Sequence, residues 1–196
     1  MTKEDSIHIS SEHLSLIYLQ TINKHDATEV YVKWLNDPQV NQYLETRFYP
    51  QNIQTLLNFI HTMETNPNEH LFTIRLKEND QHVGNIKIGA INEHHHVGDV
   101  SLFIGDKDAW GKGMASQAVQ LISRYSFDKL GLRKLCAGAY KPNIASTKAF
   151  LNSGYIDDGI LADHYTVNNQ PCDLVKVCLF SDQKNKLPDI SVIQHN

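Results

Sequence analysis

The sequence has little of what marks several classes of protein. It contains three cysteines, Cys136, Cys172 and Cys178, an odd count without the paired spacing of a zinc site or a disulfide framework. No apolar run approaches the length that crosses a bilayer, and residues 1–11 are polar and charged rather than signal-like. We therefore expect a cytoplasmic protein that has no membrane contact and works in a reducing compartment.

Neither positive nor negative charge is in large excess. The net charge is only -4, which gives no reason to expect nucleic acid as a partner. Hydrophobic residues make up 41% of the chain, as in ordinary globular proteins, and no repeat, low-complexity tract or linker divides it. We expect a single domain over residues 14–180, preceded by a loose N-terminal arm, residues 1–13, and followed by a polar C-terminal tail, residues 181–196.

Hydrophobic periodicity predicts about four helices and six to seven strands. Helical spacing follows the apparent N-cap residue Asp26, Pro50, the glycines near residue 112 and Pro142. Short apolar or alternating runs predict strands over residues 14–19, 72–76, 83–91, 100–104, 134–140, 165–167 and 174–180. Because a helix separates the strands 100–104 and 134–140, these two should be parallel. The expected fold is α/β (α+β), with a mixed, mostly antiparallel sheet.

A glycine-rich loop stands between the strand 100–104 and the next helix. The loop consists of Trp110, Gly111, Lys112, Gly113, Met114 and Ala115. Its backbone N–H groups lie at the positive end of a helix dipole, and glycines keep Cβ atoms away from an anion, which predicts a phosphate site. An ATP loop is excluded because Gly113 stands where Ser or Thr would bind magnesium. A dinucleotide loop is excluded because Ser116 replaces its third glycine.

The loop and a second motif resemble the GNAT superfamily of acyl-CoA-dependent N-acetyltransferases. In that family the pyrophosphate loop is Gln/Arg-x-x-Gly-x-Gly/Ala; Gly113 and Ala115 match it, and Trp110 takes the first position, as in the branch of the ribosomal-protein alanine acetyltransferases. The second motif, residues 143–155, is an asparagine followed by a helix that ends in a glycine and an aromatic residue. The resemblance covers roughly residues 17–180.

The resemblance implies acetyl-CoA as co-substrate and a sheet splayed at the central parallel strand pair. The loop would bind the pyrophosphate, and the strand before it would pair with the pantetheine arm as an added strand. Outside the loop, the residues assigned to CoA on this basis are Leu102, Phe103, Ile104, Asn143, Ser146 and Phe150. From the residues alone, Asn143 is equally consistent with a plain helix N-cap.

The catalytic residues carry a weaker signal. Attack by an amine on a thioester needs a neutral amine, a stabilised oxyanion and a proton for the departing thiolate. Many family members supply that proton from a tyrosine where this chain has Phe150, so Tyr140 or Tyr155 would have to replace it, although both also fit a core position. For the base, the sequence offers Asp99 and His95. Adjacent histidines rarely converge on one ion, so we expect no metal at His95 and its neighbours.

The acceptor is expected to be a small-molecule amine. Residues 34–45 and 84–89 resemble members that acetylate amino sugars carried on nucleotides, and Arg47 and Lys87 are candidates to meet the diphosphate, or else solvated surface charges. Two alternatives stay open. One is acetylation of a protein N-terminus, as in the ribosomal-protein branch, and the other is a non-catalytic acyl-CoA-binding domain. We expect a monomer or a homodimer.

Overall fold

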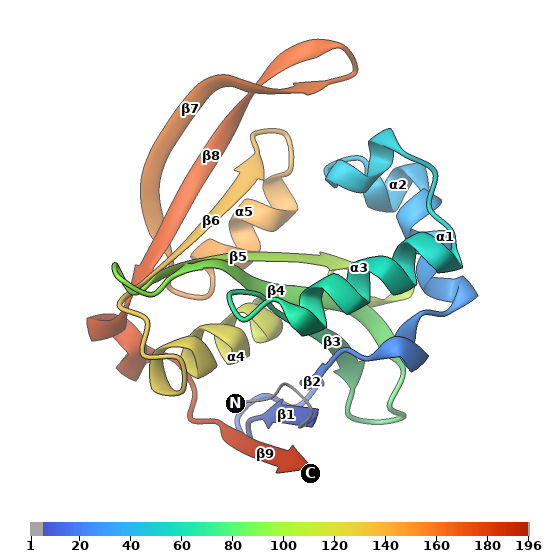
Figure 1. Cartoon of the computed structure of the whole chain (residues 1–196). Coiled ribbons are helices and arrows are strands. Elements are labelled where there is room, and N and C mark those ends of the chain that lie inside the picture. The colour runs from blue at the N-terminus through green and yellow to red at the C-terminus, as the bar shows by residue number, and fades with distance from the viewer. Residues whose placement is uncertain (1–5, 196) are drawn as a thin grey trace.

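A nine-stranded twisted sheet forms the centre of the protein in the computed structural model, which describes residues 6–195 (Figure 1). The strands are β1 (Ser6–Ser10), β2 (Ile17–Thr21), β3 (His70–Leu76), β4 (His82–Asn92), β5 (Val97–Ile104), β6 (Lys134–Tyr140), β7 (Ile156–Val167), β8 (Gln170–Phe180) and β9 (Ser191–His195). Their order in the sheet is β7-β8-β6-β5-β4-β3-β2-β1-β9. The mixed, mostly antiparallel sheet predicted from the sequence is confirmed.

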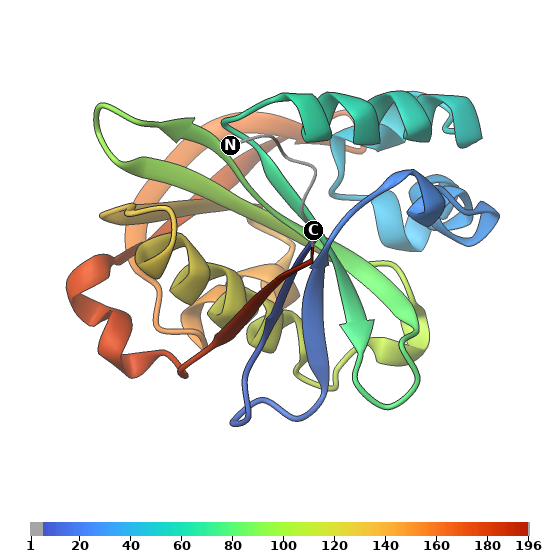
Figure 2. The same cartoon turned by 60° about the horizontal axis from the view of Figure 1, so that its bottom comes forward.

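Helices cover both faces of the sheet (Figure 2). The α-helices are α1 (Glu29–Asn36), α2 (Pro38–Asn41), α3 (Ile53–Thr65), α4 (Met114–Asp128) and α5 (Ile144–Leu151), and the 3-10 helices are η1 (Lys24–Asp26), η2 (Glu45–Phe48), η3 (Lys107–Ala109) and η4 (Ser181–Lys186). On one face, α4 buries Leu121 and Ile122 against the sheet. On the other, α1 and α3 bury Tyr31 and Ile60 in a second cluster. Among the described residues, no helix is long and apolar enough to span a membrane.

The parallel pair of strands, β5 and β6, separates partway along its length. The two strands pair only from Val97 with Lys134 to Asp99 with Cys136. Beyond that point β5 continues to pair with β4 as far as Ile104, and β6 pairs with β8 as far as Tyr140. The splay that the family resemblance implied is therefore present, between residues 100–104 and the second half of β6.

The two edges of the predicted domain need correction. Residues 6–10, expected in a loose arm, form β1, and residues 191–195, expected in a polar tail, form β9. These strands pair with each other in antiparallel register, and Ile9 of β1 is fully buried. Both are short, and β9 depends on β1, which also pairs with β2, at the opposite end of the chain, so neither carries a strong local signal. The expectation for residues 1–5 lies outside the described residues.

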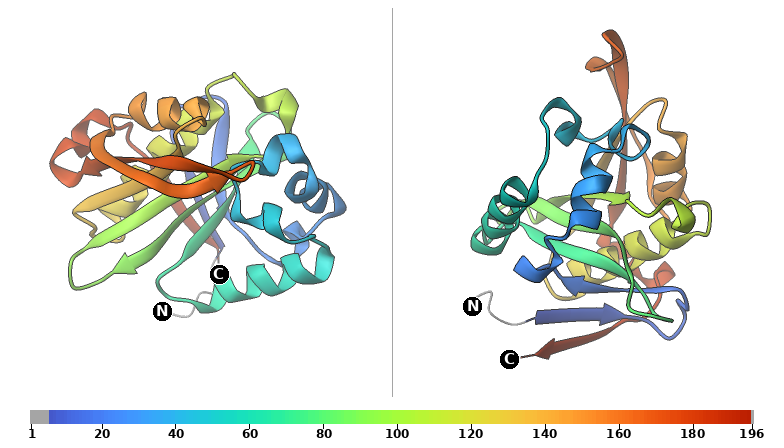
Figure 3. Two further views of the ribbon diagram at one scale, coloured as in Figure 1. Left: turned by 90° about the horizontal axis from the view of Figure 1, so that it is seen from above. Right: turned by 90° about the vertical axis from the view of Figure 1, so that its right-hand side faces the viewer.

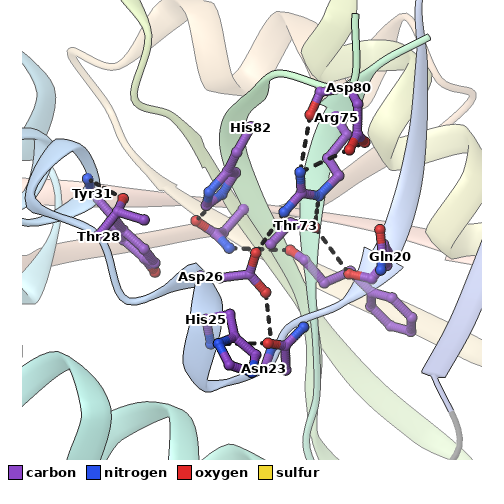
Figure 4. Close-up of polar contacts among 12 residues, drawn as sticks. Gln20, Asn23, His25, Asp26, Thr28, Tyr31, Thr73, Arg75, Asp80 and His82 are labelled. Atoms are coloured by element: carbon purple, nitrogen blue, oxygen red, sulfur yellow. Dashed lines mark hydrogen bonds and ion pairs between the residues drawn. The ribbon is translucent and has the colours of Figure 1, made fainter.

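The start of α1 also differs from the prediction. Thr28, rather than Asp26, is the N-cap, and its hydroxyl accepts from the N–H of Tyr31 at 3.2 Å. Asp26 instead ends η1 and is 5% exposed, with Oδ1 2.5 Å from Nη2 of Arg75 and Oδ2 accepting from the N–H of Asn23 (Figure 4). Both residues suit an N-cap, and the sequence alone did not show that Asp26 has an ion-pair partner on β3.

The β7–β8 hairpin extends away from the body of the molecule at one end of the sheet (Figure 3). The sequence predicted only the tip of β7, residues 165–167, because its first part is exposed and carries Gly159 and Asp163 at positive φ. Register shifts at these two places show that both residues sit in bulges. The hairpin stands opposite the α2 end of the molecule, across the splay (Figure 1).

Candidate active site

A cavity of about 1060 Å³ occupies the gap where β5 and β6 separate. Most of the predicted site residues line it, namely Leu102, Phe103, Ile104, Trp110, Gly111, Gly113, Met114, Ala115, Tyr140, Asn143, Ser146 and Phe150. Three do not: Lys112, Asp99 and His95 lie outside the lining. The sequence assigns residues of two distant motifs to acetyl-CoA, the acyl donor. The structure brings these residues together around one cavity.

The edge of β5 that faces the gap offers unpaired backbone groups. The N–H of Gly105 donates to the carbonyl of Val83 on the β4 side at 2.8 Å. Because successive residues of a strand direct their backbone groups to opposite sides, those of Leu102 and Ile104 point into the gap. The indole N–H of Trp110 donates to the Ile104 carbonyl at 2.9 Å. An extended, amide-bearing ligand can therefore pair with Leu102 and with the Ile104 N–H, while Trp110 ties the loop to the strand.

The glycine loop is built to admit an anion. Gly111 and Gly113 have φ of +74° and +81°, and a Cβ at either position would meet nothing within 4 Å. Gly113 is the N-cap of α4, and no side chain caps the first turn of this helix. The N–H groups of that turn, at the positive end of the helix dipole, therefore remain available to a ligand. The geometry suits an anion, such as the pyrophosphate predicted here from the sequence.

The start of α5 completes the donor side. Asn143 is the N-cap of this helix, and its Oδ1 accepts from the N–H of Ser146 at 3.3 Å. Asn143 also lines the cavity, so the capping role does not exclude contact between its amide and the pantetheine arm. Phe150 forms a buried wall of the cavity, with its ring edge-on to that of Tyr155. The Tyr155 hydroxyl lies 2.9 Å from Ser123 Oγ, outside the lining, so Tyr155 is a core residue.

Tyr140 belongs to a polar cluster on the opposite wall. Its hydroxyl donates to Glu45 Oε1 at 2.5 Å and accepts from Arg47 Nη2 at 3.0 Å. Burial and, after it, the hydrogen bond to Glu45 together raise the pKa of Tyr140 to about 12. Tyr140 is therefore protonated at neutral pH, and its proton is already directed to Glu45.

The same cluster bridges the cavity at its outer end. Arg47 also donates to the carbonyl of Thr166 in β7 at 3.1 Å. The ring of Tyr140 stacks on that of Tyr165 with centroids 4.5 Å apart, and the ring of Tyr43 is tilted against it with centroids 5.6 Å apart. These contacts join the segment after α2 to the β7–β8 hairpin, so the two are bridged beside the cavity that Tyr43, Tyr140 and Tyr165 line.

Asp99 and His95 lie toward the closed end of the splay. The side chain of Asp99 is 52% exposed, and its Oδ1 lies 3.6 Å from Lys176 Nζ. His95 is exposed in the turn before β5, where its N–H donates to Asn92 Oδ1 and its carbonyl accepts from Arg133. Their catalytic roles stay predictions, and the structure shows neither side chain in the cavity.

Sequence reasoning missed several polar residues of the cavity wall. They are Glu45, Thr46, Asn85 and Ser101. Asn85 is 2% exposed, and its Oδ1 lies 3.2 Å from Nε2 of His82, which is also 2.9 Å from the Gly84 carbonyl. Two acceptors require a proton on this nitrogen, and burial lowers the pKa of His82, which indicates the neutral Nε2–H form. Asn85 could have been identified as a candidate site residue from the sequence, because it is a polar residue within the apolar strand 83–91.

The comparisons with known proteins agree with this geometry. A family model described as "Acetyltransferase (GNAT) domain" matches residues 17–156. An uncharacterized N-acetyltransferase, p20 of Bacillus licheniformis, is 26% identical over 165 residues, which are 83% of this chain and 90% of the relative. Spermidine N(1)-acetyltransferase of Escherichia coli is 27% identical over 100 residues, 51% of this chain and 53% of the relative.

Solved structures share the fold. Spermidine N-acetyltransferase from Vibrio cholerae, in complex with CoA and spermine, superposes with a TM-score of 0.78. The match covers 88% of this chain and 99% of the other at 18% identity. An acetyltransferase (GNAT family) from Bacillus anthracis gives a TM-score of 0.76, also at 18% identity, and covers 89% of this chain and 99% of the other. At this identity the likeness concerns the architecture.

Proposed function

The chain belongs to the acetyltransferase (GNAT) domain family and is an acyl-CoA-dependent N-acetyltransferase, and we propose that its acceptor is an amino sugar carried on a nucleotide. Acetyl-CoA is the co-substrate and, when bound, supplies the thioester carbonyl that the amine attacks. On this proposal the loop N–H groups around Gly113 hold the pyrophosphate, and Leu102 pairs with the pantetheine arm. Asn143 holds the arm from the α5 side.

The observation that carries a small-molecule acceptor is the bridge over the cavity. Arg47 contacts Tyr140 and the Thr166 carbonyl, and the ring of Tyr140 stacks on that of Tyr165. These contacts bridge the acceptor side of the cavity. A protein N-terminus needs an open groove along which several of its residues can extend. A cavity that is bridged in this way instead suits a compact molecule. This supports the amino sugar over the alternative of N-terminal acetylation.

The charges on the acceptor wall support a sugar over a polyamine. Lys87 Nζ lies 2.6 Å from Glu69 Oε2, and Glu45 lies 3.8 Å from Arg47, so each charge has a partner of opposite sign. A polycation would need several unbalanced carboxylates to offset the loss of its hydration. A nearly neutral wall of tyrosines and amides suits a polyhydroxylated amine. Because Arg47 and Lys87 have internal partners, the charges support the sugar more than its diphosphate.

A mass-spectrometric screen with acetyl-CoA tests the proposal. The acceptors are a uridine-diphosphate-linked amino sugar, free glucosamine, spermidine and a short peptide with an N-terminal alanine. We expect an acetylated product from the nucleotide-linked sugar, with a kcat/KM at least tenfold above that of spermidine and of the peptide. Preference for spermidine or for the peptide would overturn the assignment. Binding of acetyl-CoA without any product would favour a non-catalytic acyl-CoA-binding domain.

A further inference from the structure

The 3-10 helix η2 places a carboxylate in the wall of the cavity. Glu45 lines the cavity, and its side chain is 67% exposed. Among the described residues, the hydrogen bond of this carboxylate, from Tyr140, goes to Oε1, so Oε2 is free to accept from a ligand.

Glu45 is held in one orientation by its neighbours. The Tyr140 hydroxyl fixes Oε1 at 2.5 Å, and Arg47 Nη1 lies 3.8 Å from the same oxygen. Tyr140 is itself immobilised, being 5% exposed and stacked on Tyr165. A carboxylate fixed through one oxygen has already lost most of its side-chain freedom, so a ligand on the other oxygen costs little further ordering.

We propose that Glu45 binds the ammonium group of the acceptor and that Tyr140 is the positioning residue for Glu45. An ammonium has three N–H donors and no acceptor, which matches a negatively charged carboxylate with one oxygen free of other donors. The inference rests on the acceptor being an amine, which is part of the proposed function, but it does not depend on that amine belonging to a sugar.

A purely structural role for Glu45 would be to tie η2 to the end of β6. The substitution Glu45→Gln separates the two roles, because its amide oxygen can still accept from Tyr140 while the negative charge is lost. Glu78→Gln is the matched control, since Glu78 is an exposed carboxylate in the turn between β3 and β4, away from the cavity lining. A structural role predicts equal behaviour of the two variants in ligand binding.

The test measures binding rather than turnover. Glucosamine and spermidine are titrated into the CoA-loaded protein and followed by saturation-transfer NMR. We expect at least one of them to bind the wild type, Glu45→Gln to raise its dissociation constant about tenfold, and Glu78→Gln to leave it within twofold. CoA affinity and the thermal midpoint should be unchanged in both variants. Tyr140→Phe should raise the same constant by a smaller factor, because it frees Glu45 without removing its charge.

Two results would overturn the inference. One is binding of neither amine to the wild type, and the other is an equal dissociation constant in the wild type and Glu45→Gln. Both are independent of the turnover screen, which decides only the identity of the acceptor. If the screen rejects amino sugars while Glu45→Gln still weakens spermidine binding, the role of Glu45 stands and the acceptor assignment fails.

Discussion

Gly113 is the residue on which the donor site depends most directly. Gly113→Glu should abolish measurable CoA binding, because the carboxylate would enter the anion site, while a left-handed backbone costs a non-glycine residue about 1 to 2 kcal/mol. The control is Gly131→Glu, since Gly131 has φ of +65° and open space around its Cβ, but lies after α4. Calorimetric titration with CoA and chemical denaturation check both variants. Equal CoA affinity in the two would contradict the assignment of the loop.

Asp99 and His95 are predicted bases whose side chains lie outside the cavity. We expect Asp99→Asn to keep kcat/KM within about threefold of wild type, since the carboxylate is half exposed and faces Lys176. His95→Ala should behave the same, because the contacts recorded for His95 use its backbone. The measurement is kcat/KM from pH 6 to 9. An acidic limb, meaning a fall of kcat/KM at low pH, that disappears in either variant would restore that residue as the base.

The donor residues could be predicted from the sequence because each acts through a local feature. Glycines that admit an anion and an asparagine at a helix start are visible within a few positions of the chain. The acceptor wall has no such signal. Glu45 and Tyr140 are 95 residues apart, and their hydrogen bond exists only because β6 ends opposite η2. Phe150 shows a further limit. It stands where many family members have a tyrosine general acid, and the absence of that tyrosine does not indicate which residue supplies the proton instead.

At the scale of the elements, the buried pair of Asp26 and Arg75 connects η1 to β3. Removal of one partner from a buried ion pair leaves an uncompensated charge, so Asp26→Asn should lower the free energy of unfolding by about 3 kcal/mol. Arg75 also lies 3.6 Å from Asp80, whose side chain is 68% exposed. Asp80→Asn is the control and should cost less than about 1 kcal/mol. Urea denaturation measures both, and equal losses would show that burial does not set the difference.

The elements themselves differ in how far the sequence predicts them. The helix α3 and the hairpin of β3 and β4 follow from clear periodicity and turn residues. The long strand β7 was predicted only at residues 165–167, because bulges and exposure break its alternation. The first helix was placed with the wrong cap, since Asp26 and Thr28 both suit that position. The local sequence therefore predicts whether an element is a helix or a strand better than it predicts the residues at which the element begins and ends.

At the scale of the whole molecule, β9 lies at the edge of the sheet opposite to the hairpin. Removal of residues 188–196 should lower the free energy of unfolding by about 2 to 3 kcal/mol, because the partly buried side chains of Ile190 and Val192 leave the core. Five strand spacings, about 24 Å, separate β9 from β5, so CoA affinity should stay within twofold. Denaturation and calorimetric titration check the two expectations. A tenfold loss of CoA affinity would show that the edge and the donor site are coupled.

The pairing of β1 with β9 also decides how the molecule responds to force. Ser6 lies opposite His195, so tension applied at these two residues pulls on the same end of an antiparallel ladder. Such a load opens the hydrogen bonds one after another, as a zipper opens, instead of shearing them all at once. The β1–β9 pair therefore opens first. Among the strands on the β5 side of the acyl-CoA gap, this pair is also the farthest from the gap. The molecule can fray at its joined ends while the catalytic half keeps its shape.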